Sequence, residues 1–324
     1  MSQPSVPTGS LTTACEKSGK MYELLGQKNP KTGKKIIVQT LPNPGTLYAE
    51  LIRRCGQCLG CRMARSMELG LRLEHESQFH DQSWFITLTY ADENLPEANS
   101  LKANHMSIFI KALRQDTRQK IRFFGAGEYA PDTLRPHYHL IIFGLDLPDR
   151  IYAGTSDAGN VFFRSETISK AWRHRGRIQV DSVSPATMQY VTKYHIDKIN
   201  GEQAEKHYSR PVIDELTGEY KTVQVEQESA RMSRNPGMGR KWIEKYYEDI
   251  FRHGFIGRAG GARTPIPTYY ERWCEKQHPE LYLKHRQDHA QQRNLEDDLE
   301  NRFNAKMLNR KARRAIYMPG RNND

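Results

Sequence analysis

Two histidines separated by one residue are the first candidates for chemistry in this sequence. They are His137 and His139, in the segment RPHYHLIIFG, which is rich in β-branched and aromatic residues and predicts a strand over 137–144. Side chains alternate between the faces of a strand, so both imidazoles should project from the face that carries Ile141 and Phe143. Imidazoles commonly bind divalent metals, but such a pair also arises by chance in a chain with 12 histidines. The surrounding residues must therefore decide between the two readings.

A carboxylate that could complete a metal site is Glu128, in the segment IRFFGAGEY. This segment predicts a strand over 121–128, and the turn-rich stretch APDTLRP connects it to His137. If the hairpin register places Glu128 opposite His137, all three side chains share a face. Two imidazoles and one carboxylate with open positions suit Mg²⁺ or Mn²⁺, which can polarise a scissile phosphate. A metal oxygenase or cupin could use the same ligands, but that alternative leaves the positive charge of the chain unexplained.

A second candidate cluster lies in the segment MQYVTKYHIDK, where Tyr190, Lys193 and Tyr194 stand at positions i, i+3 and i+4. We expect a helix over 184–200 with Ser184 as its N-cap, so both phenols and the ammonium share one face. A phenol of pKa about 10 attacks poorly at neutral pH unless a cation or a metal-polarised phosphate assists it. Attack on a DNA phosphate would leave a 5′-phosphotyrosine and a free 3′-hydroxyl. The alternative is an aromatic pair that packs the helix onto a sheet.

Hydrophobic periodicity predicts the elements that would position these groups. One helix is expected over 62–79, and a second contains Met106, Phe109, Ile110 and Leu113 at the spacing of one helix face. Strands are expected over 84–90, 121–128, 137–144 and 177–183. Together these elements predict an α+β fold with a central antiparallel β-sheet flanked by helices.

The charge of the chain favours a polyanionic partner. Lysine and arginine total 49 against 38 acidic residues, a net charge of +11, so nucleic acid ranks ahead of an anionic membrane surface. No stretch approaches the roughly 20 apolar residues of a membrane-spanning helix, and the N-terminus has no signal-peptide layout. We therefore expect no membrane partner and a location in the cytoplasm of the cell that makes the protein. A GxxxxGK nucleotide loop is also absent from the sequence, so DNA unwinding should come from the host.

Three of the five cysteines are crowded into the segment CGQCLGC, as Cys55, Cys58 and Cys61. An odd total and this crowding argue against a secreted disulfide framework. The C-x2-C-x2-C spacing suits a structural Zn²⁺ site, for which Cys15, His75 and His80 are candidate fourth ligands. Reduced or buried thiols without a metal are the alternative.

The basic segment SRNPGMGRKW is a candidate DNA contact. Arg234, Arg240 and Lys241, with the amides of Gly237 and Gly239, could hold a DNA phosphate. An ordinary basic loop before a helix explains the same residues equally well.

The motifs of the chain, in their order, resemble those of the HUH endonucleases that initiate rolling-circle replication. FITLTY resembles their first motif, PHYHLIIFG their paired-histidine motif and YVTK their YxxK nucleophile motif. Over about residues 55 to 250, the segments CGQCLGCR, FGAGEYAPDTLRPHYHLIIFG, QYVTKY and SRNPGMG together resemble the replication initiators of gokushoviruses, small tailless phages of the microvirus family.

This resemblance implies a phage rolling-circle replication initiator that nicks and joins single-stranded DNA at the phage origin. Tyr190 would be the primary nucleophile because it begins YxxK, with Lys193 beside it and Tyr194 as a second nucleophile that alternates with the first. The cofactor would be Mg²⁺ or Mn²⁺ at Glu128, His137 and His139. The partners would be origin DNA, a host helicase and a host DNA polymerase, in the host bacterial cytoplasm.

The sequence suggests four segments. Residues 1–61 form an N-terminal extension, irregular over 1–54, that carries the cysteine cluster; 62–200 form the nuclease core; 201–277 carry the basic Gly-containing segment and helices; and 278–324 form a polar, basic C-terminal helix and tail. Two alternatives stay open for the function. They are a relaxase or transposase of the same superfamily and a non-catalytic basic DNA-binding protein.

Overall fold

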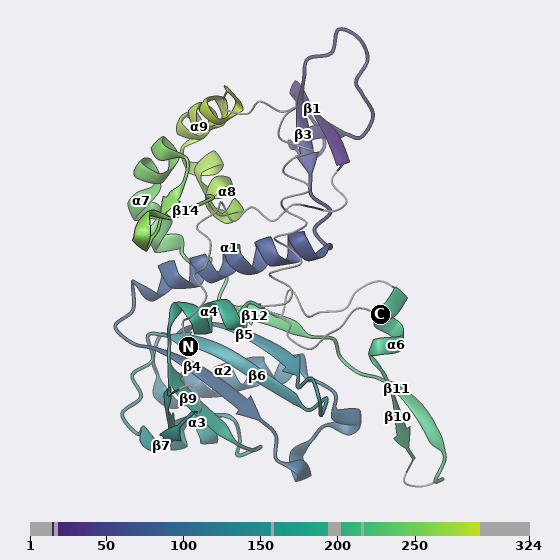
Figure 1. The fold of residues 1–324 in the computed structure, drawn as a ribbon, viewed down its shortest axis with the longest axis vertical. Coiled ribbons are helices and arrows are strands. Elements are labelled where there is room, and N and C mark those ends of the chain that lie inside the picture. The colour runs from purple at the N-terminus through teal and green to yellow at the C-terminus, as the bar shows by residue number, and fades with distance from the viewer. Residues whose placement is uncertain (1–14, 16–18, 157–158, 194–201, 215–216, 292–324) are drawn as a thin grey trace, which may run out of the picture. The chain divides into compact units, whose positions relative to one another are not determined.

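The computed structural model describes residues 15, 19–156, 159–193, 202–214 and 217–291 (Figure 1). The chain divides into two compact units. The smaller unit consists of Met1–Arg65, Arg258–Thr264 and Gln287–Asp324, and the larger unit consists of Ser66–Gly257 and Pro265–Arg286. Each unit is described by itself below.

A seven-stranded antiparallel sheet is the centre of the larger unit. Its strands, in spatial order, are β12 (Ser229–Met232), β5 (Arg122–Tyr129), β6 (Pro136–Phe143), β4 (Ser83–Thr89), β9 (Ile178–Ser182), β8 (Val161–Arg164) and β7 (Ile151–Thr155). The four strands expected from the sequence are the neighbours β5, β6, β4 and β9, with ends that differ by one residue from the prediction. The predicted α+β fold is confirmed.

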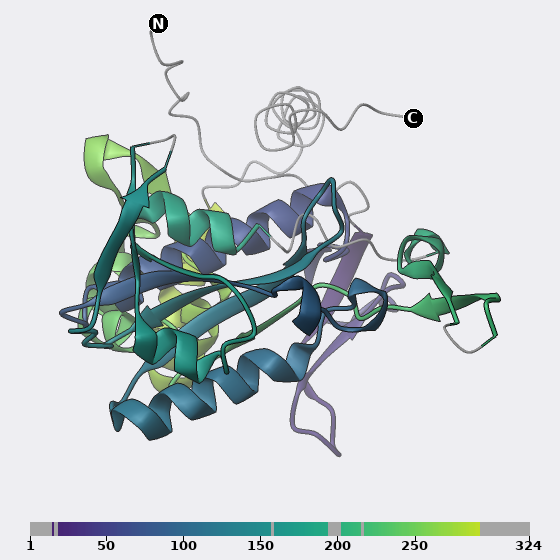
Figure 2. The same cartoon turned by 90° about the horizontal axis from the view of Figure 1, so that it is seen from below.

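Helices cover both faces of this sheet. Helices α1 (Leu59–Ser77) and α4 (Pro185–Val191) lie on one face, and α2 (Ala103–Thr117) and α3 (Glu166–Ala171) lie on the other (Figure 2). Strand β6 contributes to both interfaces, because Tyr138, Leu140 and Ile142 pack with α2 and α3 while Ile141 and Phe143 pack with α1 and α4. The alternation predicted for this strand is therefore confirmed.

Helix α1 serves two hydrophobic clusters of the larger unit, which explains why its apolar spacing is irregular for a helix with one buried face. Leu69 and Leu73 pack against the sheet. Leu71, on another side of the helix, packs with residues of α7 (Arg240–His253) and α8 (Thr268–Gln277). The helix expected at Trp242–Phe251 is thereby confirmed as α7.

The helix predicted over 184–200 begins as expected, with the Ser184 side chain accepting a hydrogen bond from the Thr187 amide. Its described part, α4, ends at Val191, and 194–200 lie outside the described residues. The remaining elements are α6 (Glu202–His207), β10 (Ser209–Ile213), β11 (Tyr220–Gln224), β13 (Ile256–Gly257), β14 (Arg263–Thr264), α9 (Pro279–Gln291) and the 3₁₀ turns Asp92–Asn94, Glu97–Asn99 and Ala259–Gly261. No described helix is long and apolar enough to span a membrane.

The smaller unit corrects the prediction that residues 1–54 are irregular. Its described part contains a three-stranded antiparallel sheet in the order β2 (Lys35–Val38), β1 (Gly19–Lys28), β3 (Tyr48–Arg53). The Gly- and Pro-containing stretches KNPKTG and LPNPGT are the connections between these strands. Backbone pairing defines the sheet, and its mostly exposed or half-buried side chains provide little hydrophobic pattern for a sequence-based prediction.

Candidate metal and nucleophile site

Glu128, His137 and His139 converge on one face of the large sheet. In the β5–β6 ladder Glu128 lies directly opposite His137, which is the register expected from the sequence. One side-chain ligand atom from each of the three residues lies within 4.8 Å of the other two. The two imidazole rings are 4.8 Å apart between centroids and nearly perpendicular, at 78°. Adjacent, hydrogen-bonded strands thus bring two imidazoles and one carboxylate to a common point.

Hydrogen bonds on the far side of each ring orient both imidazoles. His137 Nδ1 lies 3.2 Å from the Arg135 carbonyl oxygen, to which it can only donate. His139 Nδ1 lies 3.1 Å from Thr87 Oγ1, and Thr87 faces His139 across the β4–β6 ladder. A neutral imidazole that donates from Nδ1 carries its lone pair on Nε2. Thr87 is a functional residue that the sequence reasoning did not identify individually.

Burial keeps the imidazoles uncharged. It lowers the pKa of His139 to about 3, with the neighbouring His137 contributing a smaller repulsion, and it lowers the pKa of His137 as well. His139 Nε2 is buried and has no hydrogen-bond partner. A buried nitrogen lone pair without a partner is costly unless a ligand occupies it, and neutral imidazoles with a carboxylate form a donor set for a divalent cation. The residues present therefore fit a divalent metal.

Tyr190 lies next to these ligand candidates. It is carried by α4, its ring is 5.2 Å from the ring of His139 at 79°, and 46% of its surface is exposed. A second edge contact, at 6.3 Å, joins its ring to Phe85 of β4. Lys193 follows α4 and is half-buried, with its amide donating to the Tyr190 carbonyl. Tyr194 lies outside the described residues.

The residues on either side of Tyr190 attach α4 to α1. Gln189 Nε2 donates to Ser66 Oγ at 3.1 Å, and Thr192 Oγ1 lies 3.0 Å from the same oxygen. Ser66 and Thr192 are fully buried. Gly70 makes room for this contact, because a Cβ there would lie 2.5 Å from Gln189 Oε1. The helix that carries Tyr190 is therefore held by a polar contact that the sequence pattern did not reveal.

Comparison with known proteins places the chain in a family. Residues 83–199 match the family model of the replication-associated protein ORF2. The replication-associated protein VP4 of Bdellovibrio phage phiMH2K is 31% identical over 239 residues, which cover 71% of this chain and 70% of that protein. The replication-associated protein ORF2 of Spiroplasma virus 4 is 29% identical, covering 71% of this chain and 70% of that protein. No solved structure matches the chain.

The chain belongs to the family of phage replication-associated proteins. The resemblance identified from the sequence motifs is thereby confirmed. A further relative, the replication-associated protein ORF4 of Chlamydia phage 1, is 29% identical over 43% of this chain and 37% of its own length. The matched region of the family model contains Glu128, His137, His139, Tyr190 and Lys193.

The candidate DNA-contact residues of this family member lie at the start of α7. Arg234 and Lys241 are exposed, and Arg240 pairs with Glu244 at 2.6 Å. The Gly239 amide donates to Glu76 Oε2 at 2.7 Å, so it is occupied by a contact within the protein. The part of the hypothesis that used this amide for a DNA phosphate has therefore lost its donor, while a role for the three cations stays a prediction.

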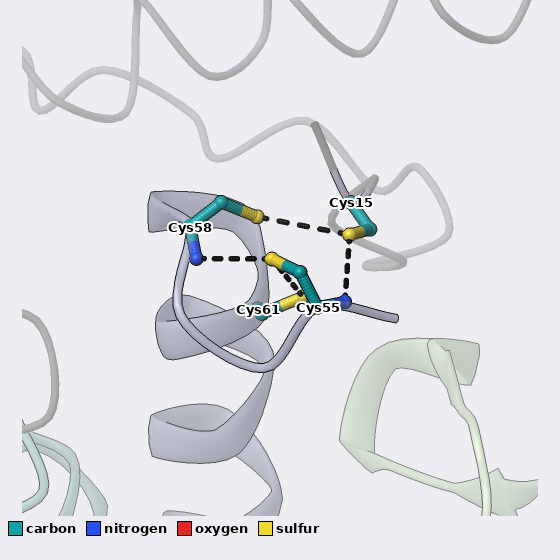
Figure 3. Close-up of side chains that lie close together, drawn as sticks. All are labelled: Cys15, Cys55, Cys58 and Cys61. Atoms are coloured by element: carbon teal, nitrogen blue, oxygen red, sulfur yellow. Dashed lines mark hydrogen bonds between the residues drawn. The ribbon is translucent and has the colours of Figure 1, made fainter. Parts of the chain in front are cut away.

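The cysteine cluster gains a fourth member, Cys15, one of the residues that the sequence left as candidates. The Sγ atoms of Cys15, Cys55, Cys58 and Cys61 all lie within 4.8 Å of one another (Figure 3). The other two candidates are engaged elsewhere. His75 stacks on Trp242 and hydrogen-bonds the Tyr270 hydroxyl, and His80 pairs with Glu76.

Proposed function

We propose that the protein initiates rolling-circle replication of phage DNA by nicking and joining single-stranded DNA through a covalent tyrosine intermediate. The observation that carries this proposal is the position of Tyr190, whose ring lies 5.2 Å from the ring of His139 at the Glu128, His137 and His139 cluster. Family membership supports a role in phage replication. The positive net charge of +11 supports a polyanionic substrate.

In this proposal Glu128, His137 and His139 hold Mg²⁺ or Mn²⁺, which when bound polarises the scissile phosphate of the DNA. Thr87 and the Arg135 carbonyl fix the tautomer and orientation of the two imidazoles. The low pKa of both histidines keeps their nitrogen lone pairs available at neutral pH. Roughly three coordination positions of an octahedral ion are left for water and phosphate oxygens.

Tyr190 is the proposed nucleophile. Its phenolic oxygen loses its proton and forms a bond to phosphorus, while the bond between phosphorus and the 3′ oxygen breaks. The departing 3′ oxygen takes up a proton, which gives a free 3′-hydroxyl and a 5′-phosphotyrosine. Attack by a 3′-hydroxyl on the phosphotyrosine reverses these changes and joins two strands without ATP.

Two further groups take part in the proposed reaction. Lys193, three residues after Tyr190, would stabilise the phenolate or the charge on the phosphorane. Tyr194 would be a second nucleophile that takes over in alternate rounds, a role that rests on the resemblance to two-tyrosine initiators. The proposed partners are single-stranded phage origin DNA, a host helicase and a host DNA polymerase, in the host bacterial cytoplasm.

A nicking assay tests the proposal. The full chain is incubated with Mn²⁺ or Mg²⁺ and labelled single-stranded oligonucleotides that tile the genome encoding it, and the products are resolved on a denaturing gel. We expect metal-dependent cleavage at one site, lost on addition of EDTA. The variant Tyr190→Phe should lose cleavage by at least about a thousandfold while its DNA affinity is kept. Its matched control is Tyr220→Phe, at a tyrosine on β11 that is 77% exposed, which should cleave normally.

Other outcomes would favour the alternatives. DNA binding with strong salt dependence and no cleavage of any oligonucleotide would indicate a non-catalytic DNA-binding protein. Cleavage that survives Tyr190→Phe but not Glu128→Gln would keep the metal site and reject the assigned nucleophile. Cleavage at an element other than a replication origin would favour a relaxase or transposase.

A further inference from the structure

The four cysteines of the smaller unit form a compact sulfur cluster contributed by three separate parts of the chain (Figure 3). Cys15 precedes the sheet, Cys55 and Cys58 follow β3, and Cys61 lies in the first turn of α1. Cys58 Sγ lies 3.9 Å from Cys15 Sγ, and Cys55 Sγ lies 4.0 Å from Cys61 Sγ.

These separations are those of a tetrahedral tetrathiolate site. A zinc–sulfur bond of about 2.3 Å gives a tetrahedron whose sulfur–sulfur edges are about 3.8 Å. A disulfide needs about 2.05 Å between its sulfur atoms, and the cysteines of the described residues are all free. The cluster thus has the size of a zinc site without any sulfur pair at bonding distance.

The loop between Cys55 and Cys58 is built to turn its amides towards a sulfur atom. The amides of Gln57 and Cys58 donate to Cys55 Sγ at 3.5 and 3.3 Å, and the Cys55 amide donates to Cys15 Sγ at 3.2 Å. Gly56 makes this turn with a φ of +77°, in the left-handed region that glycine adopts without strain. N–H groups directed at sulfur stabilise a thiolate over a thiol, so the loop favours the metal-binding form.

The smaller unit also lacks a substantial core of its own. Among its residues whose burial is described, the buried hydrophobic side chains are Met21, Cys61 and Met63. A unit with so little buried apolar surface needs another source of stability, and a structural metal is the common solution in small domains.

We propose that Cys15, Cys55, Cys58 and Cys61 bind one structural zinc ion that holds the N-terminal segment, β3 and the start of α1 together. Four thiolates leave no open position, so this site takes no part in catalysis. It is independent of the site proposed at Glu128, His137 and His139, because the hard cations proposed there prefer oxygen-rich ligand sets over thiolates. Zinc, unlike Mg²⁺ or Mn²⁺, suits four sulfur ligands.

Metal analysis of the full chain, purified under reducing conditions and dialysed against a weak chelator, tests the proposal. We expect about one zinc ion per chain in the wild type and in His139→Ala, and far less in Cys15→Ser. The matched control is Cys274→Ser, at a buried cysteine outside the cluster, which should keep its zinc. Absence of zinc from the wild type, stoichiometric iron in its place, or full zinc in Cys15→Ser would overturn the proposal.

A measurement on the unchanged protein covers the case in which Cys15→Ser does not fold. Alkylation followed by peptide mass spectrometry should find all four cysteines protected until a strong chelator removes the zinc, when they become reactive together. Cys274, whose thiol pKa is raised to about 11 by burial, should stay unmodified in both states. Alkylation of any of the four in the zinc-loaded protein, or a disulfide between two of them, would contradict the assignment. Neither result depends on nicking, so this proposal and the proposed function fail separately.

Discussion

The orientation of His139 depends on one hydroxyl group. Thr87 Oγ1 lies 3.1 Å from Nδ1, on the side of the ring opposite to Nε2. A partner of this kind fixes both the tautomer and the ring plane of a metal-binding histidine. Thr87 is thus a positioning residue of the proposed site, one hydrogen bond away from the metal.

Replacing this hydroxyl by a methyl group should weaken metal binding without removing a ligand. For Thr87→Val we predict a loss of about 10-fold to 100-fold in Mn²⁺ affinity, measured directly by titration calorimetry. The matched control is Thr89→Val, on the same strand, whose hydroxyl donates to the Arg177 carbonyl. Equal Mn²⁺ affinity in the two variants would remove Thr87 from the account.

The sequence allowed most of the candidate site to be predicted, because strand period and hairpin register together place Glu128 with His137 and His139. It could not single out Thr87, since a threonine in a strand is ordinary and its partner lies 52 residues away. Cys15 was ambiguous for the same reason, because 40 residues separate it from Cys55 and only folding shows which distant side chain joins the cluster.

At the level of elements, α4 is held to α1 by the buried contact of Ser66 with Gln189 and Thr192. For Ser66→Ala we predict a fall of about 1–2 kcal/mol in the free energy of unfolding, because buried polar partners lose a hydrogen bond. Nicking should slow because Tyr190 is less firmly placed, while Mn²⁺ affinity stays unchanged. Chemical denaturation, single-turnover nicking and calorimetry measure the three quantities.

The control for this prediction is Ser77→Ala in the same helix, whose hydroxyl donates only to the Glu74 carbonyl one turn away. It should change neither nicking nor stability by more than a few tenths of a kcal/mol. If Ser66→Ala nicked at the wild-type rate, α4 would not need this contact to place Tyr190.

The turn before α7 is a packing element. Gly239 has a φ of +74°, and a Cβ there would lie 2.2 Å from Tyr270 Oη. We predict that Gly239→Ala lowers the free energy of unfolding by more than about 2 kcal/mol, from backbone strain and the clash together. Gly218→Ala, at a φ of +73° with nothing within 4 Å, carries the strain alone and should cost about 1 kcal/mol. Equal losses in chemical denaturation would show that Tyr270 yields freely.

Elements with a clear hydrophobic period could be predicted, and those without one could not. The central strands and α2 each bury a regular set of side chains, whereas β1, β2 and β3 bury few and were interpreted as irregular. Helix α1 lies between these cases, because Leu69 and Leu73 face one cluster and Leu71 another.

At the level of the whole larger unit, Glu76 ties α1 to β5 and to the turn before α7. It pairs with Arg122 and His80 and accepts from the Gly239 amide, and its side chain is 5% exposed. Burial raises the pKa of Glu76, but the hydrogen bonds from His80 and Gly239 and the charge of Arg122 outweigh it, so the net shift is downward. The ionised form is therefore favoured by folding.

This shift predicts how stability depends on pH. A carboxyl whose pKa is lowered by folding contributes stability above its unfolded pKa, about 4.3, and that contribution is lost as the pH falls through the folded value. Glu76→Gln should therefore be less stable than the wild type at pH 7, by about 1–3 kcal/mol, with the difference shrinking below about pH 4. Urea denaturation across this range measures it.

The surface control is Glu244→Gln, which removes the i,i+4 partner of Arg240 on α7. An exposed ion pair contributes roughly 0–1 kcal/mol, so its effect should be small at every pH. A difference between the wild type and Glu76→Gln that grew as the pH fell would contradict the assigned direction.

The account of the molecule as a DNA-nicking enzyme depends most on the bond between Tyr190 and DNA. The direct measurement is mass spectrometry of the protein after incubation with Mn²⁺ and its cleaved oligonucleotide, followed by nuclease and protease digestion and peptide mapping. We predict a nucleotide attached through phosphate to Tyr190 in the wild type, absent without metal and absent from Tyr190→Phe at that position. Cleaved DNA with no covalent peptide, or an adduct formed only on a tyrosine other than 190 or 194, would contradict it.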